Sequence, residues 1–175
     1  MDLNPLIADW TGCTLCGLGD TRVKQVFYRG DVPADVMFIG LGPGKSENVV
    51  GKPFVGPSGV LLDIAIGDAL DLLNNPKRSM HFTNVVCCRP CDSKLGPNRD
   101  PTLEEALMCS PRLMKQYEVV QPKRIIFLGR VTDHLCKHLF PDGRYLLHPA
   151  AVLRAGGMGS KPYIGYVRDL SSLLR

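Results

Sequence analysis

Long hydrophobic runs are absent from this chain of 175 residues, which excludes a membrane-spanning segment. Internal repeats, low-complexity tracts and linkers are absent too. The length suits one hydrophobic core, so we expect a single domain over residues 1–175. The lack of a signal peptide predicts a reducing, cytoplasmic location in which thiols persist. Hydrophobic residues make up 45% and charged residues 22% of the chain, and these proportions exclude a disordered protein.

Strong charge and the familiar phosphate-binding loops are also lacking. The net charge of +4 is compatible with a polyanionic partner but does not by itself indicate one. The glycines at 40–44 and 51–59 lack the Gly-x-Gly-x-x-Gly spacing, and the sequence Gly44-Lys45-Ser46 lacks the glycine five residues earlier that a P-loop requires, because Ile39 stands there. A nucleotide-phosphate cradle is therefore disfavoured. The counts of 18 glycines and 14 prolines indicate many tight loops between regular elements.

Cysteines carry the strongest chemical signal in the chain. Cys13 and Cys16 form a C-x-x-C pair, which can hold one metal ion or one edge of a cluster from a single turn. Cys88 and Cys109 lie far downstream, and the fold would have to bring them to that pair. The pattern predicts a four-thiolate site for zinc or for an iron–sulfur cluster. The alternative is that these thiols are simply buried, since cysteine packs well as a small hydrophobe.

The three remaining cysteines leave the ligand set open. Cys87 and Cys91 flank Cys88, so either is an alternative third ligand. Cys136 lies in an apolar stretch, and there we expect a packed thiol without a ligand role.

Apolar segments alternate between strand-like and helix-like patterns, which predicts an α/β fold: a single-domain three-layer sandwich with a mostly parallel four-stranded sheet flanked by helices. A helix is predicted to begin after the cap Thr102, and Pro111 is expected to kink it or to restart it with Ser110 as the new cap. The other expected elements are strands at 36–39, 81–86, 124–128 and 145–147, and helices at 60–73, 131–139 and 163–174.

The loops that follow the strands are the expected place for a site, because ligands bind beyond the carboxyl ends of parallel strands. Glycines at 40–44 allow backbone N–H groups to approach a ligand. Phe54 lies in the next loop, where an aromatic ring is equally typical of a core plug and of a platform for stacking a base.

Two polar residues stand at strand ends in the same way. Asn84 follows the second strand and offers a donor and an acceptor to the edge of a base, although a turn asparagine is the commoner reading. His148 follows the fourth strand, where it can donate to an oxygen that gains negative charge, or can be an ordinary surface histidine. Arg154 and Lys161 would then meet phosphates, or only solvent.

Taken together, these loops resemble the uracil-DNA glycosylase superfamily, and most closely its iron–sulfur-bearing family 4. The segments that carry the resemblance run in family order from Cys13 to Arg154, and they are Gly40-x-Gly-Pro-Gly44, Gly51-Lys-Pro-Phe-Val-Gly56, Ser58-Gly59-x-Leu-Leu-Asp63, Thr83-Asn84, Cys88-Arg89-Pro90, Asn98-Arg99-x-Pro101, Cys109, His148-Pro149 and Leu153-Arg154.

The resemblance implies a role for each of these segments. Cys13, Cys16, Cys88 and Cys109 would hold a [4Fe–4S] cluster. Catalysis would fall to Asn84, which reads the polar edge of a flipped uracil, and to His148, which faces its O2. The remaining residues implied are Gly40, Leu41, Gly42, Gly44 and Phe54 around the base, and Pro57, Ser58 and Arg154 on the DNA.

The implied function is removal of uracil, and of other deaminated bases, from single- or double-stranded DNA by hydrolysis of the N-glycosidic bond. We expect a monomer that binds DNA and no membrane; the sequence identifies no replication or processivity partner. A catalytically weak or inactive module that binds DNA or protein is the alternative. A small electron carrier ranks lower, because it would not need Phe54, Asn84 or His148 at strand ends.

Several positions depart from the family 4 pattern. Leu41 stands where family 4 has glutamate, and a leucine there is more like family 5. Asn48 replaces an aspartate, Ala150 replaces a serine, and residues 92–97 lengthen the loop before Asn98. These changes bear on catalytic rate and base choice.

Overall fold

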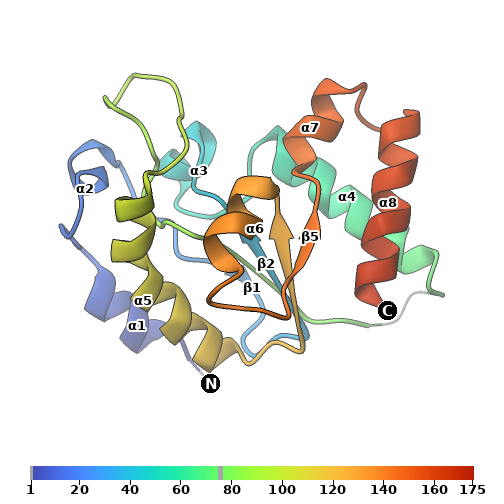
Figure 1. Ribbon diagram of the computed structural model, residues 1–175, viewed down its shortest axis with the longest axis horizontal. Coiled ribbons are helices and arrows are strands. Elements are labelled where there is room, and N and C mark those ends of the chain that lie inside the picture. Colours follow the sequence, from blue (N-terminus) through green and yellow to red (C-terminus); the bar gives the residue numbers. More distant parts are fainter. Residues whose placement is uncertain (1, 75–76) are drawn as a thin grey trace.

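The computed structural model describes residues 2–74 and 77–175 and centres on a five-stranded sheet (Figure 1). The strand order is β1-β3-β2-β4-β5. Three neighbouring pairs, β2–β3, β2–β4 and β4–β5, are parallel, whereas β1 pairs with β3 in the antiparallel sense. The strands are β1 (Arg29–Gly30), β2 (Val36–Gly40), β3 (Met80–Asn84), β4 (Arg124–Leu128) and β5 (Arg144–Leu146).

The mostly parallel sheet is confirmed, but the prediction of four strands is wrong. The additional strand, β1, is two residues long, too short for any alternation of apolar and polar residues to reveal it. The strand expected at 81–86 also ends earlier, at Asn84.

Helices cover both faces of the sheet (Figure 1). Phe38 of β2 packs in one core cluster with residues of α4 (Pro57–Asp71), α7 (Pro149–Arg154) and α8 (Lys161–Leu174). Its neighbours Met37 and Ile39 point the other way, toward α5 (Leu103–Val120) and α6 (Arg130–Cys136). All five residues of β2 are buried, as expected for a central strand with both faces covered.

Helix α5 continues through Pro111, so the predicted restart with Ser110 as a cap is wrong. Thr102 does cap the helix, and its hydroxyl accepts from the backbone N–H of Glu105 at 3.1 Å. The Ser110 hydroxyl donates to the Leu107 carbonyl at 2.8 Å. That carbonyl is the one Pro111 cannot reach, because proline has no N–H. The serine therefore supplies the missing donor inside the helix.

The first half of the chain forms three further helices: α1 (Asn4–Trp10), α2 (Leu18–Thr21) and α3 (Lys45–Val50). Leu3 and Leu6 join Ala34 and Val120 in a small third core cluster, which fixes α1 against the end of α5. No described helix is long and apolar enough to span a membrane.

Candidate functional site

The ends of β2 and β3 bring together three of the predicted residues. Gly40 and Asn84 face each other in the parallel register of these strands. A Cβ atom built on Gly40 would lie 2.5 Å from the Asn84 amide oxygen and 2.6 Å from the Phe54 ring. Only glycine leaves room for this convergence, and the amide and the aromatic ring therefore meet at one point on the carboxyl edge of the sheet.

The amide of Asn84 is available to a ligand. The residue is 3% exposed, yet no hydrogen bond to its side chain is found within residues 2–74 and 77–175. Its backbone carbonyl, by contrast, accepts from Arg112 at 2.7 Å. Its amide nitrogen and oxygen are not among the fully buried polar atoms that lack a partner, so both are accessible at the site and free for a polar partner that the site admits.

Phe54 belongs to the core, which is one of the two readings that its sequence context left open. It is 8% exposed and packs at a tilted angle on Phe82, with ring centroids 6.1 Å apart. Its φ of 56° is the left-handed conformation, which is unusual for an aromatic residue. The ring is therefore part of the core and at the same time presents itself beside Gly40 and Asn84.

Glu47 holds together the two loops that form this edge. One carboxylate oxygen accepts from the Gly44 N–H at 3.1 Å, and the other accepts from Val55 at 3.0 Å and Gly56 at 2.7 Å. The residue is 9% exposed. Because the N–H of Gly44 is engaged by Glu47, it is not free for a ligand.

The carboxylate of Glu47 comes from α3, a helix that the sequence pattern did not predict. The adjacent Asn48, which is also buried, accepts from the backbone N–H groups of Val23 and Lys24 at 2.9 and 3.4 Å. Together these two side chains join α3 to segments before and after it. Nothing in the local sequence indicated the three backbone partners of Glu47.

His148 caps α7, and one of its ring nitrogens is already committed. Its Nδ1 accepts from the Ala150 N–H at 3.1 Å, so the neutral ring carries its proton on Nε2. Burial, and then the charge of Arg154, lower the pKa of His148 below its usual 6.5. The arrangement favours a neutral imidazole whose Nε2–H is a fixed donor.

The other predicted residues lie around this edge with different exposure. Leu41 and Gly42 are partly buried, and Leu41 is not among the buried core residues. Pro57 and Ser58 are the first residues of α4; Pro57 is exposed, and Ser58 is partly buried. Arg154 is exposed at the last turn of α7.

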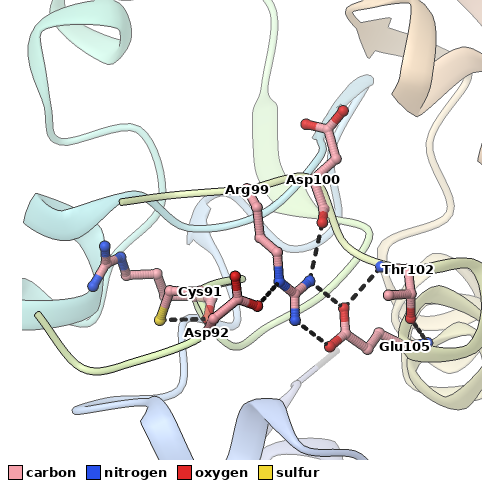
Figure 2. Close-up of polar contacts among 7 residues, drawn as sticks. Cys91, Asp92, Arg99, Asp100, Thr102 and Glu105 are labelled. Carbon is pink, nitrogen blue, oxygen red and sulfur yellow. Dashed lines mark hydrogen bonds and ion pairs between the residues drawn. The ribbon is translucent and has the colours of Figure 1, made fainter. Parts of the chain in front are cut away.

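The lengthened loop after β3 is anchored by arginines. Figure 2 shows Arg99 bound to both carboxylate oxygens of Glu105 at 2.8 Å and to Asp92 at 2.7 Å. Arg89, 1% exposed, donates to Asn98 at 2.6 Å and to the carbonyls of Lys94 and Gly96. These contacts tie the segment to the start of α5, and nothing in the sequence pattern indicated them.

The four cysteines predicted as ligands line one cavity, together with Cys87. They come from three distant parts of the chain: the turn before α2, the segment after β3, and α5. Cys87 Sγ lies 3.8 Å from Cys109 Sγ, and Arg22 lies 3.7 Å from Cys88 Sγ. Among the described residues, no three His, Cys, Asp or Glu side chains are already arranged to hold a metal ion.

The thiols differ in their surroundings. A hydrogen bond from Cys87 and the charge of Arg22 lower the pKa of Cys88, although burial acts in the opposite direction. The lowered pKa favours the thiolate form of Cys88. Cys91 is buried and donates to the Arg89 carbonyl at 3.6 Å. Cys136 is fully buried in the core, and burial raises the pKa of its thiol to about 12. Neither of these last two lines the cavity.

Comparison with known proteins relates most of the chain to one family. The family model described as the uracil DNA glycosylase superfamily matches residues 27–171. The type-4 uracil-DNA glycosylase of Saccharolobus solfataricus is 42% identical over 141 residues, which are 80% of this chain and 60% of the relative. That of Sulfurisphaera tokodaii is 39% identical over 128 residues, 73% of this chain and 53% of the relative.

A weaker match is the type-5 uracil-DNA glycosylase of Pyrobaculum aerophilum, 30% identical over 113 residues, which cover 58% of this chain and 47% of the relative. The chain therefore spans about half to two thirds of the length of the curated relatives it matches.

Proposed function

Because the chain belongs to the uracil DNA glycosylase superfamily, we propose that it removes uracil from DNA by hydrolysing the N-glycosidic bond and leaves an abasic site. The observation that carries this proposal is the convergence of Gly40, Phe54 and Asn84 at one edge of the sheet. A base inside a duplex is out of reach of such an edge, so the target nucleotide must be flipped out of the stack.

Recognition of the flipped base falls to Phe54 and Asn84. The aromatic ring offers a stacking surface, worth roughly 1–3 kcal/mol for a base. The free amide of Asn84 offers one acceptor and two donors, which match the alternating N–H and C=O groups on the edge of uracil. Burial of this amide strengthens its hydrogen bonds, because water does not compete for them.

Catalysis is proposed to act on the leaving group. Breaking the bond leaves an oxocarbenium-like sugar and a uracil anion, and the Nε2–H of His148 donates to the oxygen on which that charge develops. A single preorganised donor of this kind contributes about 3 kcal/mol by analogy with oxyanion holes. Since His148 is held neutral, it stabilises the anion without transferring a proton.

The attacking water has no evident carboxylate base in this arrangement. Leu41 cannot orient water or carry charge, and both oxygens of Glu47 already accept backbone N–H groups. The proposed reaction therefore relies on stabilisation of the departing base, after which water adds to the sugar carbon.

DNA is proposed to cross the start of α4 and the exposed end of α7. The N-terminus of α4, with Pro57 and Ser58, presents a positive dipole end suited to a phosphate. Arg154 adds a mobile positive charge close to His148. A monomer suffices for these contacts.

The cysteine-lined cavity is proposed to hold a [4Fe–4S] cluster through Cys13, Cys16, Cys88 and Cys109. The donor set fits, because the cavity is lined by thiols and by no carboxylate or imidazole. Cys87 also lines it, so it competes with Cys88 for the third position. When bound, the cluster would join the N-terminal segment to α5.

The cluster assignment is tested by purifying the protein under low oxygen. We expect a brown protein that is bleached by Cys13→Ser, Cys16→Ser, Cys88→Ser and Cys109→Ser but not by Cys136→Ser or Cys91→Ser. A colourless protein with stoichiometric zinc would disprove the cluster. Bleaching by Cys87→Ser but not by Cys88→Ser would reassign the third ligand.

The activity is tested on a uracil-containing oligonucleotide, single- and double-stranded, with cleavage of abasic sites by alkali as the readout. We expect strand cleavage that depends on the uracil. A protein that binds the oligonucleotide and never cleaves it, nor any other deaminated base, would support the second candidate, a DNA-binding module without turnover.

Leu41 is the observation that favours this second candidate, and it also allows a direct test. Because Leu41 lies partly exposed at the site, a carboxylate introduced there need not enter the core. We expect Leu41→Glu to raise uracil excision or to narrow the range of bases accepted. Unchanged activity in a variant with an unchanged melting temperature would show that this position does not govern the chemistry.

A further inference from the structure

Arg112 is a buried cation without a carboxylate partner. Its side chain lies on α5 and is 0% exposed. No Asp or Glu oxygen lies within 4.0 Å of its guanidinium in the described part of the chain, and its Nε has no hydrogen-bond partner there. The described ion pairs all involve other, partly exposed basic residues.

The contacts of this guanidinium reach two different parts of the molecule. One terminal nitrogen donates to the Asn84 and Val85 carbonyls, both at 2.7 Å, and lies 3.7 Å from Cys109 Sγ. The other donates to Gln116 at 2.7 Å and to Thr83 at 3.1 Å. A single side chain therefore connects a cysteine of the cavity with the backbone of the base-reading asparagine.

The carbonyl and hydroxyl groups around Arg112 accept hydrogen bonds from some of its N–H groups, but they do not neutralise its positive charge. An unpaired charge in the protein interior is disfavoured by several kcal/mol, even after relaxation. The nearest candidates for negative charge are the sulfur atoms of the cavity, because four thiolates around a metal group leave a net negative charge. Lysine could not replace this residue, since only the planar fork reaches several acceptors at once.

We propose that Arg112 is a positioning residue that couples the cysteine site to base recognition. Its charge balances the thiolate-bound group through Cys109, and its fork fixes the carbonyl, and hence the placement, of Asn84. The inference rests on the proposed function, because it gives the cavity its metal group and Asn84 its uracil.

The test compares Arg112→Met, Arg112→Lys and the wild type, all purified with the cluster. Lys115→Met is the matched control, because it removes an exposed charge from the same helix. The measurements are the reduction potential of the cluster, the single-turnover rate of uracil excision, the affinity for DNA, and the melting temperature.

For Arg112→Met we expect a more negative reduction potential, because a positive charge and a donor near the sulfur are lost. We also expect excision to slow by roughly tenfold or more, with little change in DNA affinity, because two charge-assisted hydrogen bonds position Asn84. Arg112→Lys keeps the charge, so it should restore most of the potential while excision stays slow. Lys115→Met should change neither quantity.

A folded Arg112→Met protein with wild-type potential and wild-type excision would overturn the inference, as would an equal shift of potential in Lys115→Met. If Arg112→Met does not fold, Arg112→Lys decides: wild-type excision in that variant would exclude a role for the fork. A wild type that is colourless and inactive would instead overturn the proposed function, before any variant is compared.

Discussion

Asn84 and His148 differ in how their hydrogen-bonding atoms are committed. The side chain of Asn84 has no hydrogen-bond partner in the described structure, whereas Nδ1 of His148 already accepts a hydrogen bond from the Ala150 N–H. The first can adapt its amide to a ligand, and the second presents one donor in a fixed direction. A site with one adaptable and one fixed group can both select a base and stabilise its anion.

Replacement of Asn84 tests the recognition role. We expect Asn84→Ala to slow single-turnover excision by roughly tenfold to a thousandfold, because the hydrogen bonds to the base edge are lost, while DNA affinity changes little. The melting temperature should not fall, since the wild-type amide has no partner to lose. A full excision rate in this variant would remove Asn84 from the chemistry.

The pH dependence tests the state of His148. Its pKa in the folded protein lies below 6.5, so excision should be constant through neutral pH and should decline only below that range. The unfolded chain then binds a proton that the folded chain refuses, so the stability contributed by this group is present above pH 6.5 and is lost as the pH falls through the folded pKa. The measurement is a pH–rate profile under saturating single-turnover conditions.

Arg154→Gln provides the control, because Arg154 contributes to the lowered pKa of His148. In the pH–rate profile of this variant, the decline in rate at low pH should begin at a higher pH than in the wild type. An unmoved decline, or a rate that rises on acidification, would contradict a neutral donor.

The sequence predicted Asn84, His148 and the four cavity cysteines through their positions at strand ends and their spacing. It did not predict the roles of Glu47 and Arg112, because only the folded chain brings near the backbone N–H groups that Glu47 accepts from and the carbonyls of Asn84 and Val85 that Arg112 donates to. The one signal for Arg112 was its spacing of three residues from Cys109 on a helix, which places a charge on a buried face.

At the level of elements, α3 is the part on which the glycine loops depend. It is six residues long and supplies Glu47, whose carboxylate accepts from both loops. Such a short helix has little stability of its own and is held by these contacts.

We expect Glu47→Ala to lower the free energy of unfolding by about 2–4 kcal/mol, because one buried and two partly buried N–H groups lose their acceptor. The rate of uracil excision by this variant should also fall, since the loops carrying Gly40 and Phe54 are released from each other. Urea denaturation measures the first effect, and exposed Glu104→Ala is the matched control. Equal stability of the two variants would show that the loops hold without this carboxylate.

Ser110 and Pro111 in α5 allow a sharper test. The effect of replacing Ser110 on the free energy of unfolding should depend on whether Pro111 is present. We expect Ser110→Ala to lower the free energy of unfolding by about 1 kcal/mol, since the Leu107 carbonyl loses its donor. In a Pro111→Ala background the restored N–H should take that place, so the same serine change should have almost no effect. Additive effects in the double-mutant cycle would refute the compensation.

Helices α4, α5, α6 and α8 were predictable from their periodic apolar faces, and they lie within a few residues of where the pattern placed them. Strands β2 and β4 are only five residues long, and they were predictable from short apolar runs. The short elements α1, α2, α3, α7 and β1 were not predicted, because they carry neither signal. Helix α3 is held by the contacts of Glu47 with residues 44, 55 and 56, and α7 begins at His148, whose ring caps it through the Ala150 N–H.

For the whole molecule, the cysteine cavity is the place where the N-terminal segment meets α5. Apart from the small cluster around Leu3 and Leu6, this segment has few buried apolar residues before Val26. If the proposed cluster is bound, removing it should therefore loosen the segment before Val26 most.

We expect an iron chelator under reducing conditions to lower the melting temperature and to expose the segment before Arg22 to protease, because ligation is a cross-link between distant parts of the chain. Cys13→Ser should reproduce both effects without chelator. If chelator-treated and untreated protein have the same melting temperature and the same resistance to protease, the cavity does not cross-link the N-terminal segment to the rest of the fold.

The cavity also imposes an order on biosynthesis. The five cysteines that line it are spread from residue 13 to residue 109, so a chain leaving the ribosome has only two of them, Cys13 and Cys16, until the strand that ends at Asn84 has been made. The buried arginine that reaches this strand follows the last cysteine by three residues. His148 emerges later still. The chain order thus places every residue proposed to hold the cluster, and those proposed to bind the base at the ends of β2 and β3, ahead of His148, which is proposed to stabilise the departing base.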